Sequence, residues 1–455
     1  MSETLAELKS AIFADYRLKT PASRALFDRA RHCLPGGVSG NLRFFSPYPL
    51  YMRSGEGCVA IDIDDNRYLD CFSCNGPLML GHRHPSVFAG EAELARVGSL
   101  VLNPEILVEC AELLQASVPC AEKVRFLNSG TEAVLTAVRL ARGYTGKPKI
   151  VKFYGHYHGQ DDQFLLGVAP NRDPFGAGIP DASFENTLTL PFNQIAPLEQ
   201  LLSSCDDIAA VILDPAMHSG GLWGADPEFL RAARDLTRDK GVVLIFDEVI
   251  TGFRICLGGA QAHYGVTPDL ATFGKALSGG EKLGAVVGCD AVMAVTDPLA
   301  VAGTPRVFQS GTGNDGTMAL AAAVGALKEY RRLQELGEYD RLAERTESLE
   351  QGMRNTFQRH GIPLHVNRLA SMMQLFVSRK VPSFEAYSEI DNAILELFYL
   401  ALINEGVMLS LPTSNHIYFS FMHDEKAFDE IAEAVSRVLE KYPFSAASAL
   451  SERQG

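Results

Sequence analysis

The stretch DIAAVILDPAMHSGGLWGADPEFLRAARDLTRDKGVVLIFDEV, residues 207–249, decides the fold class. It opens with an apolar run, 207–215, that ends at a proline, and closes with a second apolar run, 242–249, that ends in two carboxylates. Between them, residues 227–241 carry apolar side chains at helical spacing and stop at a glycine. Strand, helix and strand in this order form one right-handed crossover unit. The sequence therefore predicts an α/β fold with a parallel sheet.

The same alternation continues upstream, and a different pattern begins downstream. Residues 149–153 predict another strand, after a helix that opens at Ser129. From Thr317 one long helical pattern runs into a C-terminal third with short strand-like runs at 372–377 and 416–421. This change of pattern predicts a domain boundary near residue 325.

Composition and charge exclude several classes of protein. The 455 residues are 47% hydrophobic and 21% charged, with a net charge of −14, which argues against a nucleic-acid binder with a basic surface. No apolar run is long enough to span a bilayer, and the first twenty residues lack the features of a secretory signal. Nine irregularly spaced cysteines favour free thiols in a reducing compartment, so we expect a cytoplasmic protein.

Four groups of polar residues follow predicted strands or open a helix, where ligands of open α/β sheets bind. Asn128–Glu132 is a hydroxyl-bearing turn at a helix start, which suits a phosphate. Tyr157, in a loop between two glycines, offers an aromatic face. Asp247 ends an apolar strand, where a carboxylate needs a cationic or strong donor partner. Lys275 follows an apolar run, where burial favours the neutral, nucleophilic amine.

Each of these features also has an ordinary structural explanation. Ser and Thr cap many helices, a structural arginine often pairs with a buried Asp, and most lysines are surface charges. The sequence also contains a second chemical alternative, a metal-dependent hydrolase. Its ligands would be His156, His158, Asp161 and Asp162, with further ligands from other strand ends. The GxGxxG segment at 311–316 fits a dinucleotide site poorly, because no acidic-ended strand follows its helix.

Taken together, the four groups fit one cofactor. A phosphate cradle, a ring stacker, a strand-end carboxylate and a buried amine are what pyridoxal 5'-phosphate (PLP) requires. We therefore predict a PLP enzyme without a bound metal.

The chain resembles the class III aminotransferase group of fold-type I PLP enzymes, above all the glutamate-1-semialdehyde 2,1-aminomutases and D-phenylglycine aminotransferases. The motifs that carry the resemblance are PGGVSGNLRFF (35–45), GPLMLGHRHP (76–85), VRFLNSGTEAVLTAVRLARGYTGKPKIVKF (124–153), FDEVITGFR (246–254) and DLATFGK (269–275). The resemblance implies a large domain, residues 71–325, with a mostly parallel sheet of the seven-stranded type. A smaller α+β domain would combine residues 1–70 with residues 326–455.

The resemblance also implies roles around the cofactor. Lys275 matches the lysine that forms the internal aldimine, and Asp247 matches the partner of the pyridine nitrogen. Val249 and Tyr157 match the residues on the two ring faces. The residues that match the phosphate-binding turn are Ser129, Gly130 and Thr131.

Further implied roles concern the partner subunit and the substrate. Thr312 matches a residue that contacts the neighbouring subunit's phosphate, so a homodimer is implied. Arg43 matches an arginine that binds the substrate carboxylate. Asn75 stands where the aminomutases carry a tryptophan of the substrate pocket, and Asn415 where they carry a glutamate. These departures favour an aminotransferase that exchanges an amino group between a small amino acid or amine and a keto acid, with the intramolecular aminomutase as the alternative.

Overall fold

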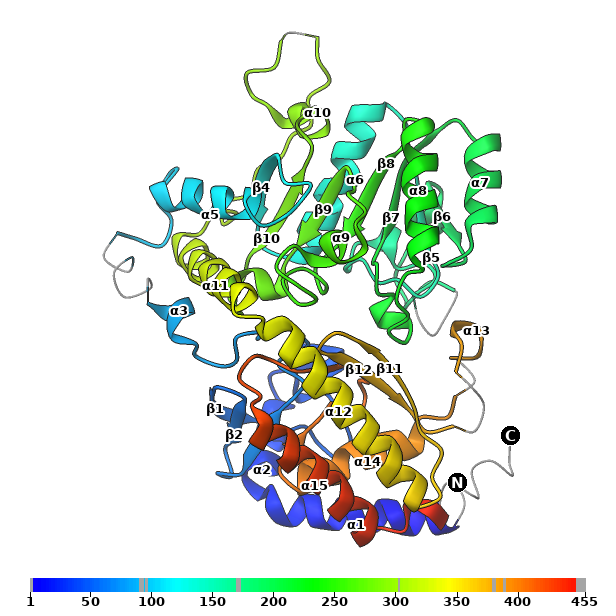
Figure 1. Ribbon diagram of the computed structural model, residues 1–455. Helices are drawn as coiled ribbons and strands as arrows, with labels where there is room; N and C mark the ends of the chain where they lie inside the picture. Colours follow the sequence, from blue (N-terminus) through cyan, green and yellow to red (C-terminus); the bar gives the residue numbers. More distant parts are fainter. Residues whose placement is uncertain are drawn as a thin grey trace. The chain divides into compact units, whose positions relative to one another are not determined.

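The computed structural model describes residues 3–89, 94, 97–168, 173–301, 303–378, 382–387 and 390–446 (Figure 1). The chain divides into two compact units. The central unit spans Pro85–Tyr339, and the terminal unit combines Met1–His84 with Asp340–Gly455.

Within the described residues, the central unit is built on a seven-stranded sheet. The strands in spatial order are β4 (Lys123–Leu127), β10 (Gly284–Gly288), β9 (Leu270–Phe273), β8 (Val243–Asp247), β7 (Ile208–Leu213), β5 (Lys149–Phe153) and β6 (Thr187–Leu190). The five strands from β9 to β6 pair in parallel, whereas β10 runs antiparallel to both β4 and β9. This arrangement confirms the predicted fold class.

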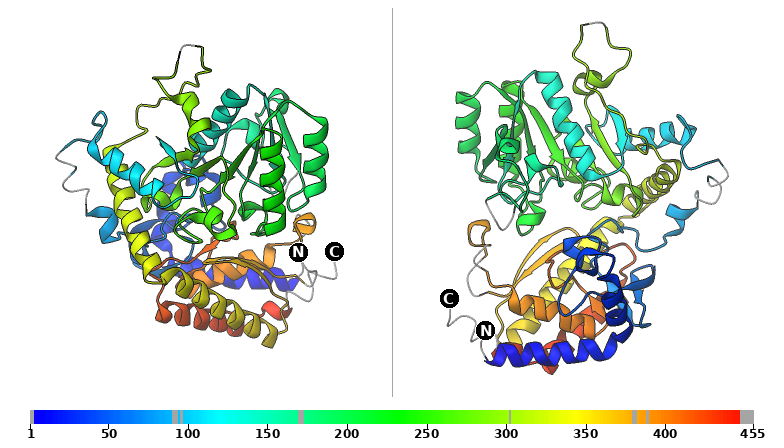
Figure 2. Two further views of the ribbon diagram at one scale, coloured as in Figure 1. Left: turned by 45° about the horizontal axis from the view of Figure 1, so that its top comes forward. Right: turned by 180° about the vertical axis from the view of Figure 1, so that it is seen from behind.

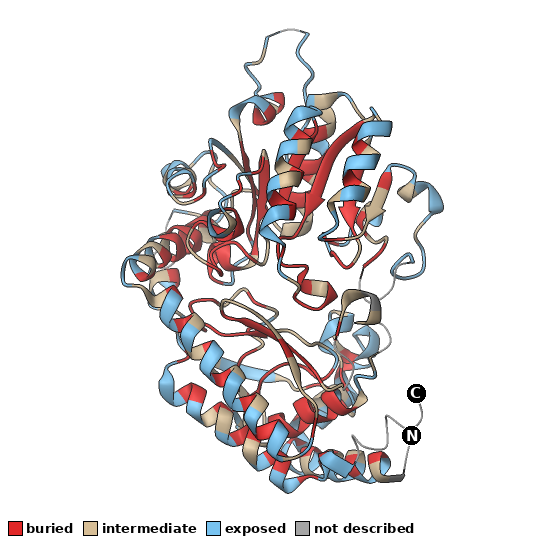
Figure 3. Ribbon diagram, turned by 45° about the vertical axis from the view of Figure 1, so that its right-hand side comes forward, coloured by how far each residue is buried: buried red, intermediate tan, exposed pale blue. Residues whose placement is uncertain are grey.

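Helices cover this sheet. They are α3 (Pro85–Phe88), α5 (Glu105–Gln115), α6 (Gly130–Thr145), α7 (Ile195–Ser204), α8 (Pro227–Asp239), α9 (Gly259–Tyr264), α10 (Asp290–Met293) and α11 (Thr317–Glu335). Helix α6 buries Val134, Val138 and Leu140 against Ile212 and Ile245 of the sheet, and each such side chain contributes roughly 1.5–3 kcal/mol. Figure 3 shows the strands as buried and the outward faces of the helices as exposed. Among the described helices, none combines the length and apolar character needed to cross a membrane.

The stretch 207–249 folds as β7, α8 and β8, which confirms the predicted crossover unit. Asp226 caps α8, because its carboxylate accepts a 2.8 Å hydrogen bond from the backbone N–H of Glu228. Pro227 occupies the first helical turn, where its missing N–H costs nothing. Gly241, with φ 60°, turns the chain into β8.

The terminal unit contains two small sheets. Strands β1 (Met52–Glu56), β2 (Val59–Asp62), β3 (Arg67–Asp70) and β13 (Val407–Met408) form the first, and β11 (His365–Leu369), β12 (Met372–Phe376) and β14 (Ile417–Tyr418) the second. Its helices are α1 (Glu3–Lys19), α2 (Pro21–Ala30), α12 (Glu338–Arg359), α13 (Phe384–Tyr387), α14 (Ala393–Asn404) and α15 (Glu425–Lys441).

Both ends of the chain contribute to this terminal unit. Strand β13 pairs in parallel with β3, although more than 300 residues separate them. Helix α1 packs on α14, where Asn404 donates a 3.1 Å hydrogen bond to the carbonyl of Ile12 (Figure 2). The N-terminal segment is therefore a structural part of this unit.

Two boundaries differ from the expected ones. The long helical pattern from Thr317 is two helices, because Gly337 adopts φ 72° after α11 and before α12. The chain passes from one unit to the other after His84 and after Tyr339, whereas the expected boundaries were at residues 70 and 325. Helix α11 packs on α3 and α5, so its whole length belongs to the central unit.

Candidate active site

Lys275 lies one residue beyond strand β9, after Gly274. It opens the short 3-10 helix η6 (Lys275–Ser278), and its backbone adopts φ 41°, in the left-handed region that non-glycine residues rarely enter. Such backbone strain is frequent at functional sites. Gly279 ends η6 with φ 61°, and a Cβ there would lie 2.6 Å from Val87, so only glycine fits this turn.

The side chain of Lys275 lines a cavity of about 200 Å³ in the central unit. The cavity collects residues that follow β4, β5, β7, β8 and β9, because these strand ends meet at one edge of the sheet. Its lining residues are Ser129, Gly130, Thr131, Val134, Tyr157, His158, Gly159, Asp214, Asp247, Val249, Ile250 and Lys275. The structure thus brings together the turn, the aromatic residue, the carboxylate and the amine that were singled out in the sequence.

The amine of Lys275 has a pKa closer to neutral pH than that of an ordinary lysine. Burial lowers the pKa of Lys275 to about 8, an effect that Arg254 reinforces and that the anions Asp247 and Asp214 oppose. An ordinary lysine amine is almost entirely protonated at neutral pH. Lys275 therefore has a far larger neutral, nucleophilic fraction there than a surface lysine.

Asp247 is 5% exposed and held by three donors. One carboxylate oxygen accepts hydrogen bonds from the backbone N–H of Val249, at 3.1 Å, and from the hydroxyl of Thr272, at 3.3 Å. The other lies 2.7 Å from Nδ1 of His158. The protein partner of this carboxylate is therefore a histidine, which the sequence had suggested only as a metal ligand.

The start of α6 forms one wall of the cavity. The hydroxyl oxygen of Ser129 caps the helix by accepting a 3.2 Å hydrogen bond from the N–H of Glu132, and Glu132 in turn accepts from the N–H of Asn128 at 2.7 Å. The first N–H groups of a helix have no intrahelical partner and carry the positive end of its dipole. This wall therefore suits a phosphate.

Two glycines at that wall stand where no larger residue fits. A Cβ on Gly130 would lie 2.8 Å from the side chain of Val249, and a Cβ on Gly159 would lie 2.7 Å from the hydroxyl of Thr131. The backbone around the turn is thus closely packed and leaves no room for further side chains.

The amine, the acid, the aromatic face and the helix start together fit PLP.

Two buried groups near the site were not among the predicted site residues. Asp214 accepts hydrogen bonds from the N–H groups of Ala216 and His218, at 2.9 and 3.1 Å, and burial raises its pKa to about 7. Lys152 donates a 3.0 Å hydrogen bond to the carbonyl of Phe164, and burial lowers its pKa to about 7. The signals that could have found them are a lysine inside the apolar run of β5 and a carboxylate that ends β7.

Three predicted site residues are not among the residues that line this cavity. Thr312 is exposed, while Asn314 of the same segment accepts a 2.9 Å hydrogen bond from Asn128, directly before the turn at Ser129. Arg43 and Asn75 belong to the terminal unit. Asn75 accepts hydrogen bonds there from the Tyr418 hydroxyl, at 3.3 Å, and lies 3.2 Å from Nδ1 of His416.

The metal-dependent hydrolase is not supported. Among the described residues, no three His, Cys, Asp or Glu side chains are grouped so that they could hold a metal ion. His158 binds Asp247, Nδ1 of His156 accepts the N–H of Asp214 at 3.0 Å, and Asp161 caps a short helix through the N–H of Gln163. Three of the four proposed ligands are therefore engaged in separate structural contacts.

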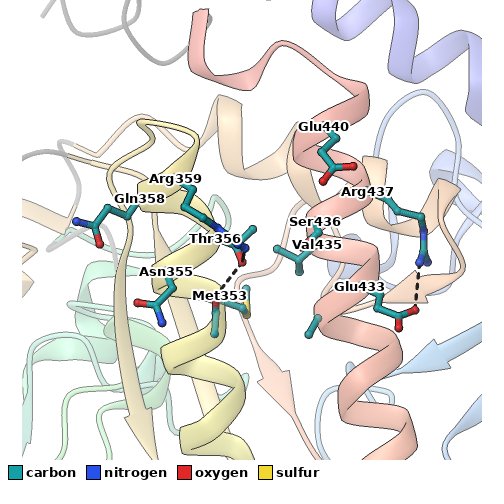
Figure 4. A pocket seen from close by; sticks show the side chains of 12 residues that line it. Met353, Asn355, Thr356, Gln358, Arg359, Glu433, Val435, Ser436, Arg437 and Glu440 are labelled. Atoms are coloured by element: carbon teal, nitrogen blue, oxygen red, sulfur yellow. Dashed lines mark hydrogen bonds and ion pairs between the residues drawn. The ribbon is translucent and has the colours of Figure 1, made fainter.

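A larger hollow of about 940 Å³ lies between α12 and α15 in the terminal unit (Figure 4). Its charged side chains include Arg359, Glu433, Arg437 and Glu440, and Arg437 pairs with Glu433 at 3.6 Å. The lining contains no lysine, histidine or aromatic residue. It therefore lacks the amine and the ring-stacking face that PLP needs.

A family model for class-III aminotransferases matches residues 45–439. The chain belongs to this family. It is also 37% identical over 429 residues to the glutamate-1-semialdehyde 2,1-aminomutase of Natranaerobius thermophilus, covering 92% of this chain and 98% of the relative. Further relatives that are 35–38% identical to this chain are also named as glutamate-1-semialdehyde 2,1-aminomutases.

Solved structures agree with this membership. An omega-transaminase from Sphaerobacter thermophilus matches with a TM-score of 0.85 and 34% identity, covering 92% of this chain and 97% of that one. A transaminase with PLP bound matches with a TM-score of 0.85 and 31% identity, covering 94% and 99%. The chain is thus an enzyme of fold type I, and its cofactor is PLP.

Proposed function

We propose that the cavity around Lys275 is the PLP site and that the enzyme uses it to move an amino group on a small substrate. One observation carries this proposal: the amine of Lys275, with its pKa lowered to about 8, and the buried carboxylate of Asp247 line the same cavity. A nucleophilic amine and a fixed anion are the two groups that a PLP enzyme needs from its protein.

Each wall of the cavity has a role in binding. Ser129, Gly130 and Thr131 would hold the phosphate at the start of α6. Tyr157 and Val249 would cover the two ring faces. Asp247 would hold the proton of the ring nitrogen. Its other donors, among them His158, keep the carboxylate in one orientation.

PLP, when bound, supplies a conjugated ring that withdraws electrons from a substrate carbon. Lys275 would hold the cofactor through its Nζ, and its freed amine would carry a proton to and from that carbon. Burial keeps its amine neutral enough to act as the base. The carboxylate of Asp247, at the end of β8 and fixed by the N–H of Val249, would keep a proton on the ring nitrogen.

For the fate of the amino group, the relatives favour the intramolecular aminomutase over the aminotransferase that we expected from the sequence. Relatives at 35–38% identity carry the aminomutase name. An aminotransferase is the second candidate, because Asn75 stands where the aminomutases carry a tryptophan and because the structure of an omega-transaminase matches at 34% identity. Both use the same residues of the cavity.

Residues that do not line the cavity suggest the class of substrate and a homodimeric assembly. Arg43 would pair with a substrate carboxylate through its two-pronged guanidinium, so we propose a small amino acid as substrate. We also propose a homodimer in which Thr312 serves the phosphate site of the partner subunit. The exposed apolar side chains of Leu299, Val301 and Phe308, on the segment before Thr312, support this assembly. A cytoplasmic location remains a prediction.

One assay separates the two candidates. The purified enzyme, loaded with the aminated form of the cofactor, receives glutamate 1-semialdehyde without any other amino donor or keto acid. Complete conversion to the isomer supports the aminomutase. Reaction of a single equivalent, with turnover restored by an added amino donor and keto acid, supports the aminotransferase. Absence of reaction with this compound, and of the PLP-loaded enzyme with a panel of L-, D- and β-amino acids, would contradict both.

A further inference from the structure

Two buried histidines lie behind the carboxylate of Asp247. His156 is fully buried and His158 is 1% exposed. Each uses Nδ1 in a hydrogen bond: His156 accepts from the backbone N–H of Asp214 at 3.0 Å, and His158 lies 2.7 Å from the Asp247 carboxylate. Nε2 of each ring is buried and has no hydrogen-bond partner in the protein. Buried polar atoms of this kind usually bind an ordered water.

The two contacts fix opposite tautomers. A backbone N–H can only donate, so Nδ1 of His156 is unprotonated and its proton is on Nε2. Nδ1 of His158 faces a carboxylate acceptor, so it carries the proton and leaves a lone pair on Nε2. Burial lowers the pKa of both rings, although Asp247 opposes the shift of His158, and this favours the neutral form of each. One free donor and one free acceptor therefore remain on neighbouring rings.

The spacing of the rings suits a bridging molecule. Their centroids lie 5.8 Å apart at an interplanar angle of 58°, and no direct hydrogen bond joins them. We propose that one buried water joins Nε2 of His156 to Nε2 of His158, which makes His156 a positioning residue for Asp247. The water accepts from His156 and donates to His158. This inference rests on the proposed role of Asp247 at the ring nitrogen.

The bridge has a chemical consequence. It holds the ring of His158 so that Nδ1 keeps donating to Asp247. Without it, the carboxylate loses a well-oriented donor and its negative charge is less stabilised. A more basic carboxylate draws the ring-nitrogen proton toward itself. A bound cofactor would then withdraw fewer electrons from the nitrogen of Lys275, so this nitrogen would keep its proton to higher pH.

The test follows the visible absorbance of the holoenzyme against pH. His156→Phe keeps an aromatic body that can pack on Phe192, whose ring centroid lies 4.6 Å away, but removes both ring nitrogens. We expect the midpoint of the absorbance change to rise by about half a pH unit. His156→Gln offers a carbonyl acceptor and an N–H donor and should return the midpoint toward the wild-type value. Phe192→Leu, which removes packing alone, should leave it unchanged.

Two outcomes would overturn the inference: an unchanged midpoint in His156→Phe, or an equal shift in Phe192→Leu. Asp247→Asn tests the underlying role separately. If it leaves the midpoint unchanged, the proposed role of Asp247 is wrong, whatever His156 does. A second measurement uses the wild-type protein and so does not depend on whether His156→Phe folds. Nitrogen-15 NMR of ring-labelled histidines in the holoenzyme should show His156 protonated at Nε2 and His158 at Nδ1, and the opposite tautomers would overturn the inference.

Discussion

Lys275 and Asp214 line one cavity, and burial brings their pKa values close together, to about 8 and about 7. The amine loses its charge and the acid gains its charge over neighbouring pH ranges. Because the anion of Asp214 favours the protonated amine, the two titrations influence each other.

Attachment of PLP to Lys275 should therefore accelerate as the pH rises through about 8. Only the neutral amine attacks the aldehyde, and its fraction falls about tenfold for each pH unit below the pKa. The measurement is the rate at which the visible band grows after PLP is added to cofactor-free protein between pH 6 and about 9.5. A rate that is flat or falls across this range would contradict the assignment.

Asp214→Asn should move that rate profile to lower pH by roughly half a unit. The substitution removes an anion that favours the charged amine. Its effect should fade below about pH 7, where Asp214 is itself protonated. Asp235→Asn, on an exposed position of α8, is the control and should leave the profile in place.

Gly130→Ala should weaken PLP binding about tenfold, or roughly 1.4 kcal/mol. The added Cβ would lie 2.8 Å from Val249, which must move within the cavity wall. Equilibrium dialysis gives the dissociation constant. The double variant Gly130→Ala with Val249→Ala should recover part of the lost affinity if the clash is the cause, and equal losses in both variants would argue against it.

Glu248→Ala should lower the free energy of unfolding by about 2–4 kcal/mol. The carboxylate accepts hydrogen bonds from the N–H groups of Ala260 and Gln261, from the Gln261 side chain and from the Thr251 hydroxyl. Urea unfolding of the cofactor-free protein measures the loss. Glu228→Ala, on the exposed first turn of α8, should change the same quantity by less than about 0.5 kcal/mol.

The double variant Leu299→Asp with Phe308→Asp should dissociate the proposed homodimer. These side chains are 88% and 79% exposed, and new charges there would oppose burial against a second copy. Sedimentation velocity should show a dimer for the wild type and a monomer for the variant, together with weaker PLP binding. The matched control is Lys240→Asp, another change to aspartate at an exposed position, which should remain dimeric.

Two features could be predicted because they depend on sequence order: the parallel part of the central sheet, and the arrival of the Ser129 turn, Tyr157, Asp247 and Lys275 in one cavity. Apolar runs and glycine stops identify β7, α8 and β8, and parallel strands place their carboxyl ends at one edge. Tyr157, Asp247 and Lys275 follow such strands, so their arrival in one cavity needs no knowledge of rotamers.

Side-chain pairing could not be predicted in the same way. His158 binds Asp247 rather than a metal because of the direction in which a single loop turns its ring, which the residue types do not specify. The break at Gly337 was hidden because charged helical residues continue on both sides of it. Lys152 was overlooked because one lysine in an apolar strand is compatible with an exposed edge as well as with burial.

The absorbance spectrum of the purified protein tests the central claim most directly. Wild-type protein with PLP should show a visible band that survives gel filtration, and Lys275→Ala should lose it. Lys282→Ala removes an exposed lysine shortly after η6 and should keep the band. A band that persists in Lys275→Ala, or a wild-type protein that stays colourless with PLP, would contradict the account.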